Sequence, residues 1–252
     1  MKIARFLSTT LGVFLILSAS SLPVAKAEVK ICDFGTKVED LKKIQTRENR
    51  EDSAGIIAEL KIRKDLLKIT ATCLKDNTET LDTELSLIKA STPEMKAFIE
   101  WMHRQLQENI AFYSYKETQI DTLGIQGAKD IARELASRKA QADTTLENLV
   151  ISILDWNSNQ PLFETGSKRF SDIKKTLDAF KLPNDHEVIV LEKEAVTLFN
   201  AASLENQGAW KDFTDREVES GRIKMKESLE KLAEAYTVFL KISEVSKKTL
   251  PL

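Results

Sequence analysis

The stretch that decides the fold runs from residue 60 to residue 88 and reads LKIRKDLLKITATCLKDNTETLDTELSLI. A leucine or isoleucine returns every seventh residue along it, at Leu60, Leu67, Leu74, Leu81 and Ile88. This repeat places the five side chains on one side of an α-helix as a continuous apolar seam. The positions between them are mixed in character, which favours a helical bundle over a strict two-stranded coiled coil. We therefore predict one long helix from about residue 52 to residue 90, more than about 50 Å in length.

The same helix carries a second apolar stripe, formed by Ile62, Leu66, Ile69 and Cys73. At about 100° per residue this stripe falls on the side of the helix opposite the leucines. A helix that is apolar on two sides has to be covered on both. We expect the N-terminal segment that contains Cys32 to strap across this second face and to be pinned there by a disulfide.

The first residues have the features of a secretory signal peptide. Lys2 and Arg5 form a basic start, the apolar stretch Leu11–Leu17 follows, and Ala25-Lys26-Ala27 fits a small-x-small cleavage site before Glu28. The apolar stretch is shorter than the ~20 residues that a spanning helix needs. We predict that residues 1–27 direct export to a periplasm, cell surface or extracellular space. The alternative is that they stay on the chain as an uncleaved anchor.

The chain has two cysteines, Cys32 and Cys73, and both lie after the predicted cleavage site. In an exported protein, two cysteines most simply form one disulfide. The bridge would close a loop of about 40 residues, which the chain-entropy account values at roughly 4 kcal/mol. The alternative is a pair of free buried thiols, because the spacing of the two cysteines matches no metal motif.

Glycine and proline are scarce, with eight and five copies in 252 residues. Sheet proteins need these residues for their many tight turns, so the scarcity predicts an all-α fold. We expect an elongated antiparallel bundle of long helices with short connections. The hydrophobic share of 42% is enough for a packed core, which disfavours a disordered chain.

We expect the mature chain to have two parts. The clearest linker signal is Asn157-Ser158-Asn159-Gln160-Pro161, which is polar and ends in a proline. It divides an N-terminal helical bundle, residues 28–157, from a C-terminal helical part packed on it, residues 161–252. Within the second part we predict a turn around Gly208 and Trp210. A final helix should open at the capping-box pattern Thr214-x-x-Glu217.

The charge balance disfavours two classes of partner. Cleavage at Ala27 would remove three basic residues and leave 34 basic against 39 acidic side chains, a net charge of −5. Nucleic acids require clustered Lys and Arg, and so do anionic lipid surfaces. We expect no nucleic-acid partner and no integral membrane segment after cleavage.

Two histidines leave little material for a metal site or a catalytic centre. Glu100 and His103 share a helix face, as in four-helix carboxylate proteins, but the chain has no second Glu-x-x-His pair. A shared zinc would need His186, with its neighbour Glu187, to meet them. The sequence therefore predicts no cofactor, no metal and no catalytic residue. If a metal does bind, Glu100, His103 and His186 are the candidate ligands.

Two functional classes stay open. The first is a non-enzymatic scaffold or protein-binding protein of the cell envelope or exterior, with an unidentified protein partner. The second is a bundle that binds a small apolar or aromatic ligand, as a sensor or carrier does, because helical bundles build such pockets between helices. Trp210, Phe163 and Phe199 would then form the ligand or partner surface. An ordinary core is the simplest role for these aromatic residues.

Overall fold

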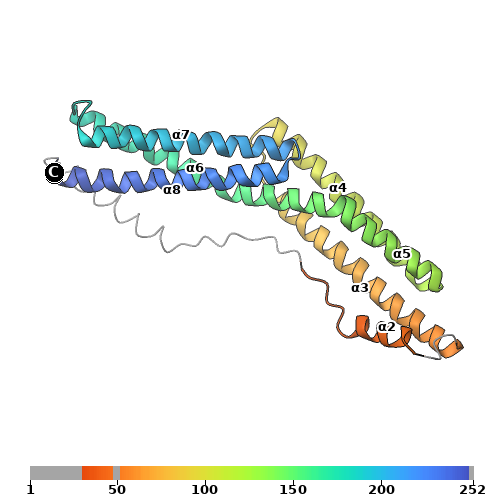
Figure 1. Ribbon diagram of the computed structural model, residues 1–252. Coiled ribbons are helices and arrows are strands. Elements are labelled where there is room, and N and C mark those ends of the chain that lie inside the picture. Colours follow the sequence, from red (N-terminus) through yellow and green to blue (C-terminus); the bar gives the residue numbers. More distant parts are fainter. Residues whose placement is uncertain (1–29, 48–51, 250–252) are drawn as a thin grey trace. The chain divides into compact units, whose positions relative to one another are not determined.

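The computed structural model describes residues 30–47 and 52–249, and every regular element in these ranges is helical (Figure 1). The predicted all-α fold of long, packed helices is thereby confirmed. The predicted signal peptide, residues 1–27, lies outside the described residues. Among the helices of the described ranges, none has the length and apolar character needed to cross a membrane.

Contacts between Cα atoms divide the chain into two units, one of residues Ala27–Leu154 and one that contains Asp155–Leu252. We call them the first and the second unit. The helix α6 (Thr144–Phe180) begins in the first unit and continues into the second.

In its described residues, the first unit has six helical elements before α6. They are α2 (Lys37–Gln45), α3 (Ser53–Ser86), α4 (Pro93–Gln119), the 3₁₀ turn η1 (Ile120–Thr122), α5 (Ile125–Arg138) and the π-helical turn η2 (Lys139–Asp143). Side-chain caps fix where the long helices begin. The Asp52 carboxylate accepts the Gly55 amide at 2.6 Å, and the Thr92 hydroxyl accepts the Met95 amide at 3.1 Å, one residue before Pro93. These caps satisfy backbone donors that have no partner inside the helix.

The leucine seam of α3 forms the core of the first unit, as predicted. Leu67, Leu74 and Leu81 are buried, and Leu60 packs against the same cluster. Figure 1 shows α4 and α5 running beside α3. The cluster around Leu67 and Leu74 also contains Ala71, Tyr113, Ile120, Ala128, Ile131 and Leu135.

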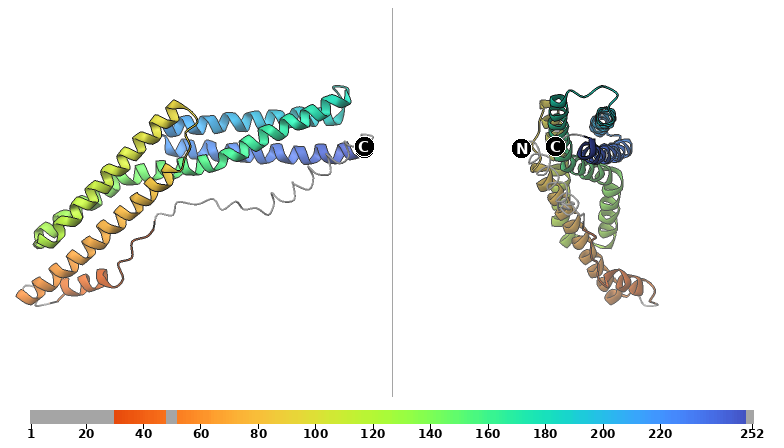
Figure 2. Two further views of the ribbon diagram at one scale, coloured as in Figure 1. Left: turned by 180° about the vertical axis from the view of Figure 1, so that it is seen from behind. Right: turned by 90° about the vertical axis from the view of Figure 1, so that its left-hand side faces the viewer.

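The predicted strap lies on α3. Cys32 and Cys73 form a disulfide, with their Cα atoms 5.7 Å apart. The Asn77 side chain makes two hydrogen bonds with the backbone of Lys30: it accepts the amide at 2.9 Å and donates to the carbonyl at 2.8 Å. Helix α2 then packs against α3 and buries Ile44 (Figure 2).

The second unit consists of the continuation of α6 with α7 (Glu187–Thr214) and α8 (Val218–Thr249). Helices α7 and α8 lie side by side, as Figures 1 and 2 show, and a short turn joins them. Their shared core includes Phe170, Leu177, Val188, Ala195, Ala235, Val238, Phe239 and Ile242. The small residues Ala195 and Ala235 allow the helix backbones to approach closely at those points.

The predicted linker at residues 157–161 is wrong in its local structure, because the chain is helical there and Pro161 lies inside α6. The polar side chains bond back to the helix instead of leaving it. Asn159 donates to the Asp155 carbonyl at 2.9 Å, and Gln160 donates to the Trp156 carbonyl at 2.9 Å. These bonds occupy helix carbonyls in the turn before the proline, where the missing proline N–H weakens the backbone ladder.

The predicted turn at Gly208 and Trp210 is also wrong, since both residues lie within α7. The chain turns after Thr214, where Arg216 has a φ of 67°, and α8 begins at Val218. Thr214-x-x-Glu217 therefore does not open the final helix. The observed turn is fixed by Asp212 at the end of α7, whose backbone carbonyl accepts the Glu217 amide at 2.8 Å.

Candidate functional site at a π turn

In the first unit a five-residue π turn, η2, joins α5 to α6. A π turn inserts one extra residue into the helical register, and such turns are frequent at functional sites. The Lys139 carbonyl accepts both the Thr144 amide and the Thr144 hydroxyl, the latter at 2.7 Å. In this turn Ala142 is exposed and Asp143 is buried.

Asp143 is a buried carboxyl group, with 1% of its surface exposed. The Tyr113 hydroxyl of α4, which is equally buried, donates a hydrogen bond to Asp143 Oδ2. Among the residues that the structure describes, none makes a hydrogen bond to Asp143 Oδ1. Burial and, to a lesser extent, the nearby carboxylate of Glu147 raise the pKa of Asp143 to about 7.

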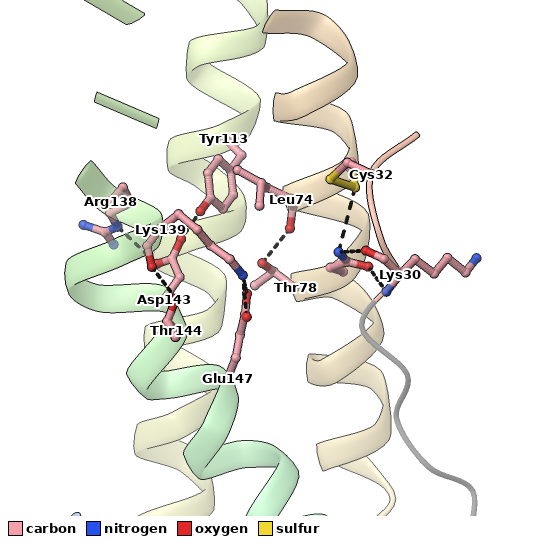
Figure 3. A network of polar contacts seen from close by, with 12 residues as sticks. Lys30, Cys32, Leu74, Thr78, Tyr113, Arg138, Lys139, Asp143, Thr144 and Glu147 are labelled. Atoms are coloured by element: carbon pink, nitrogen blue, oxygen red, sulfur yellow. Dashed lines mark hydrogen bonds and ion pairs between the residues drawn. A yellow bond between two sulfur atoms is a disulfide. The ribbon is translucent and has the colours of Figure 1, made fainter. Parts of the chain in front are cut away.

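Two cations lie beside these carboxyl groups (Figure 3). The Lys139 ammonium donates to both carboxylate oxygens of Glu147, which is 8% exposed. The Arg138 guanidinium donates to the Asn109 amide oxygen, and its Nε stands 3.5 Å from Asp143 Oδ1. We call Tyr113, Arg138, Lys139, Asp143 and Glu147 the π-turn cluster.

Tyr113 and Asp143 each have only 1% of their surface exposed, so neither side chain is within reach of an external molecule in this arrangement. Catalytic acids and bases must reach the proton that they transfer within hydrogen-bond distance. The cluster can therefore hold α4 against the junction of α5 and α6 and change its charge with pH.

This cluster was not predicted from the sequence, although the sequence contains a usable signal for it. Asp143 stands three, seven and ten residues before Leu146, Val150 and Ile153, which are all buried. A carboxyl group that keeps helical spacing with core residues is itself a candidate for burial. Its partner Tyr113 is 30 residues away along the chain, and only the fold brings the two together.

The predicted aromatic surface residues lie in the second unit. Phe163 is buried with Ala202 and Leu232, and Phe199 packs against that cluster. The ring of Phe199 also lies 4.4 Å from the ring of Phe170.

The third aromatic residue, Trp210, lies on the ring of Trp156 at a centroid distance of 4.7 Å. Trp156 donates from its indole N–H to the Asn206 carbonyl at 3.2 Å, and the Asn206 side chain pairs with that of Gln160. The structure thus brings Phe163 and Phe199 into one cluster and gives Trp210 an aromatic neighbour in α6.

The candidate metal ligands Glu100, His103 and His186 each have a different structural partner. His103 Nδ1 lies 2.6 Å from Asp82 Oδ1, while the exposed Glu100 pairs with Lys96 at 3.9 Å. His186 belongs to the second unit, where it precedes Glu187 and accepts the Val188 amide at the start of α7. Within residues 30–47 and 52–249, no three His, Cys, Asp or Glu side chains form a group that could hold a metal ion.

Comparisons of the chain with protein-family models, with curated proteins and with solved structures gave no match.

Proposed function

We propose that this protein is an exported, non-enzymatic helical scaffold or protein-binding protein of the cell envelope or exterior. The observation that carries the proposal is the disulfide between Cys32 and Cys73, which ties the strap to the middle of α3. Such a bond persists in oxidising compartments and is rare in the reducing cytosol. The signal-peptide pattern of residues 1–27 supports the same location.

The polar residues that could be considered as catalytic groups have structural partners, which supports a non-enzymatic role. His103 joins α4 to α3 through Asp82, whose second oxygen accepts the Gln107 side chain at 2.6 Å. His186 caps α7. Asp143, the carboxyl group with a pKa raised to about 7, is enclosed by the first unit.

Exposed apolar side chains on the helices provide contact points for a partner. Ile57 at the start of α3 is 68% exposed, and so is Leu204 on α7. Isolated exposed apolar residues are common on proteins, but the best binding contacts are apolar or aromatic groups that a partner can cover. The two residues give one probe position in each unit.

Photo-crosslinking in the native cell tests the proposal. A photo-reactive amino acid replaces Ile57 in one variant and Leu204 in another, and the adducts are identified by mass spectrometry. The control places the same amino acid at Lys226, an exposed and charged position on α8.

A protein adduct that forms at Ile57 or Leu204, but not at Lys226, is expected. Absence of adducts at both apolar positions would contradict a protein-binding role. It would favour the second class, a carrier of a small apolar ligand whose pocket involves Phe163 and Phe199.

A further inference from the structure

We propose that the π-turn cluster is a proton-dependent latch on the junction of α5 and α6. With Asp143 protonated, the junction stays packed on α4. When Asp143 loses its proton, the junction opens locally and admits water. The proposal does not depend on which partner the protein binds.

The two cations beside Asp143 have other hydrogen-bond acceptors. The Lys139 ammonium donates hydrogen bonds to both carboxylate oxygens of Glu147. Arg138 donates to Asn109 and lies over the ring of Phe112 at 5.3 Å. Its Nε stands 3.5 Å from Asp143 Oδ1 as an ion pair, but neither cation donates a hydrogen bond to that oxygen, so an ionised Asp143 would keep a buried oxygen without a hydrogen bond. A buried charge without such bonds is strongly unfavourable.

Polar and charged groups from α3, α4, α6 and the junction of α5 and α6 face Asp143. Helix α4 contributes the Tyr113 hydroxyl, and α6 contributes the carboxylate of Glu147 one turn further on. The junction itself contributes Arg138 and Lys139. Helix α3 contributes Thr78 near the cluster (Figure 3). The Thr78 side chain is uncharged, and its hydroxyl donates to the Leu74 carbonyl of the same helix. A second carboxylate at close range adds repulsion to the cost of ionising Asp143.

The backbone that carries Asp143 departs from α-helical geometry. The π turn η2 closes through a wider ring than an α-helix does, and its last residue is Asp143 itself. Opening the turn would carry Asp143 towards water without unfolding α3. Because burial and Glu147 raise the pKa of Asp143 to about 7, both protonation states are populated near neutral pH.

The direction of the pH effect follows from proton linkage. The closed junction holds the Asp143 proton up to about pH 7, whereas an open and hydrated carboxyl group releases it near its ordinary value of 3.8. Between these values the closed state binds more protons, so rising pH favours opening. The opening constant should rise about tenfold per pH unit in this window and level off above about pH 7.

Hydrogen exchange of the full chain, followed by mass spectrometry from pH 5 to pH 8, tests the proposal. After correction for the intrinsic exchange rate, the opening constant of residues 139–147 should rise about fiftyfold between pH 5 and pH 7, because the rise begins to level off as the pH reaches 7. The amides of α3 between Leu67 and Leu81 should not follow it. Asp143→Asn should abolish the rise, and Asp76→Asn, at an exposed position of α3, should leave it intact.

An opening constant that is flat with pH in the wild-type chain, or a rise that survives in Asp143→Asn, would overturn the latch. A direct titration of the wild-type chain keeps the proposal testable if Asp143→Asn does not fold. The carboxyl ¹³C resonance of Asp143 should titrate with a midpoint near pH 7. A midpoint near pH 4 would also overturn the proposal.

Discussion

Removing the disulfide is the most informative perturbation of the first unit. The double variant Cys32→Ser/Cys73→Ser opens a loop whose ends are separated by 41 residues. In the chain-entropy account, a closed loop of this size restricts the unfolded chain by about 4 kcal/mol at 25 °C. We expect the free energy of unfolding of this unit to fall by that amount.

The strap should show the effect most strongly, because the disulfide ties it to α3 at Cys73. Its other contacts with α3 include the two hydrogen bonds between Lys30 and Asn77, the burial of Ile44, and an ion pair of 2.7 Å between Lys37 and Asp65. The ion pair is partly exposed and contributes at most about 1 kcal/mol. Residues 30–45 should therefore lose most of their protection from hydrogen exchange in the double variant.

Pulsed hydrogen exchange along a urea titration measures both effects, because it reports each helix separately. For a slope of about 2 kcal/mol per molar urea, the midpoint of α3 should fall by about 2 M. Helix α7, in the second unit, serves as the internal control and should keep its midpoint. A loss below about 1 kcal/mol in α3, with protection of residues 30–45 unchanged, would refute this reasoning.

Three further predictions concern packing and charge. Gly221→Ala would place a Cβ 2.4 Å from the Phe213 ring, so we expect a net loss of about 2 kcal/mol in urea denaturation of the second unit, and a neutral result would contradict this packing. Leu81→Ala, at a fully buried seam position, should destabilise the first unit by about 2–5 kcal/mol; a loss below about 1 kcal/mol would mean that the seam is not core. The hydrogen bond from Lys224 holds the pKa of Asp212 below its ordinary value, so this group stabilises the fold above about pH 4 and loses that contribution as the pH falls. Asp212→Asn should therefore flatten the acid side of the melting-temperature profile of α7 and α8, and an unchanged acid side would disprove this role.

The parts of the fold that the sequence predicted correctly rest on short-range patterns. The seven-residue repeat of α3 identifies its buried side, and Leu67, Leu74 and Leu81 are in the core. The pairing of Cys32 with Cys73 followed from the number of cysteines and an apolar face that needed a cover. Scarce glycine and proline predicted helices, and the described residues form only helical elements.

The predictions of a linker and of a turn were wrong at a proline and at a glycine that lie inside helices. Pro161 lies within α6, where Asn159 and Gln160 bond back to the carbonyls of Asp155 and Trp156. Gly208 lies inside α7, where an added Cβ would come 3.2 Å from the Lys224 side chain, so the glycine serves helix contact and not a turn. The contact of Gly208 with α8 joins two helices, and no local pattern shows it.

The π-turn cluster was missed for a related reason. Its hydrogen bond between Tyr113 and Asp143 and its contact between Asn109 and Arg138 each span about 30 residues. At the π turn Ala142 is exposed and Asp143 is buried.

The intact mass of the protein, purified from its native cell without reductant, tests the central claim most directly. An exported, disulfide-tied scaffold should appear as a single chain that begins at Glu28 and lacks two hydrogen atoms, because Cys32 and Cys73 are joined. A chain that begins at Met1 and carries two free thiols would contradict the account.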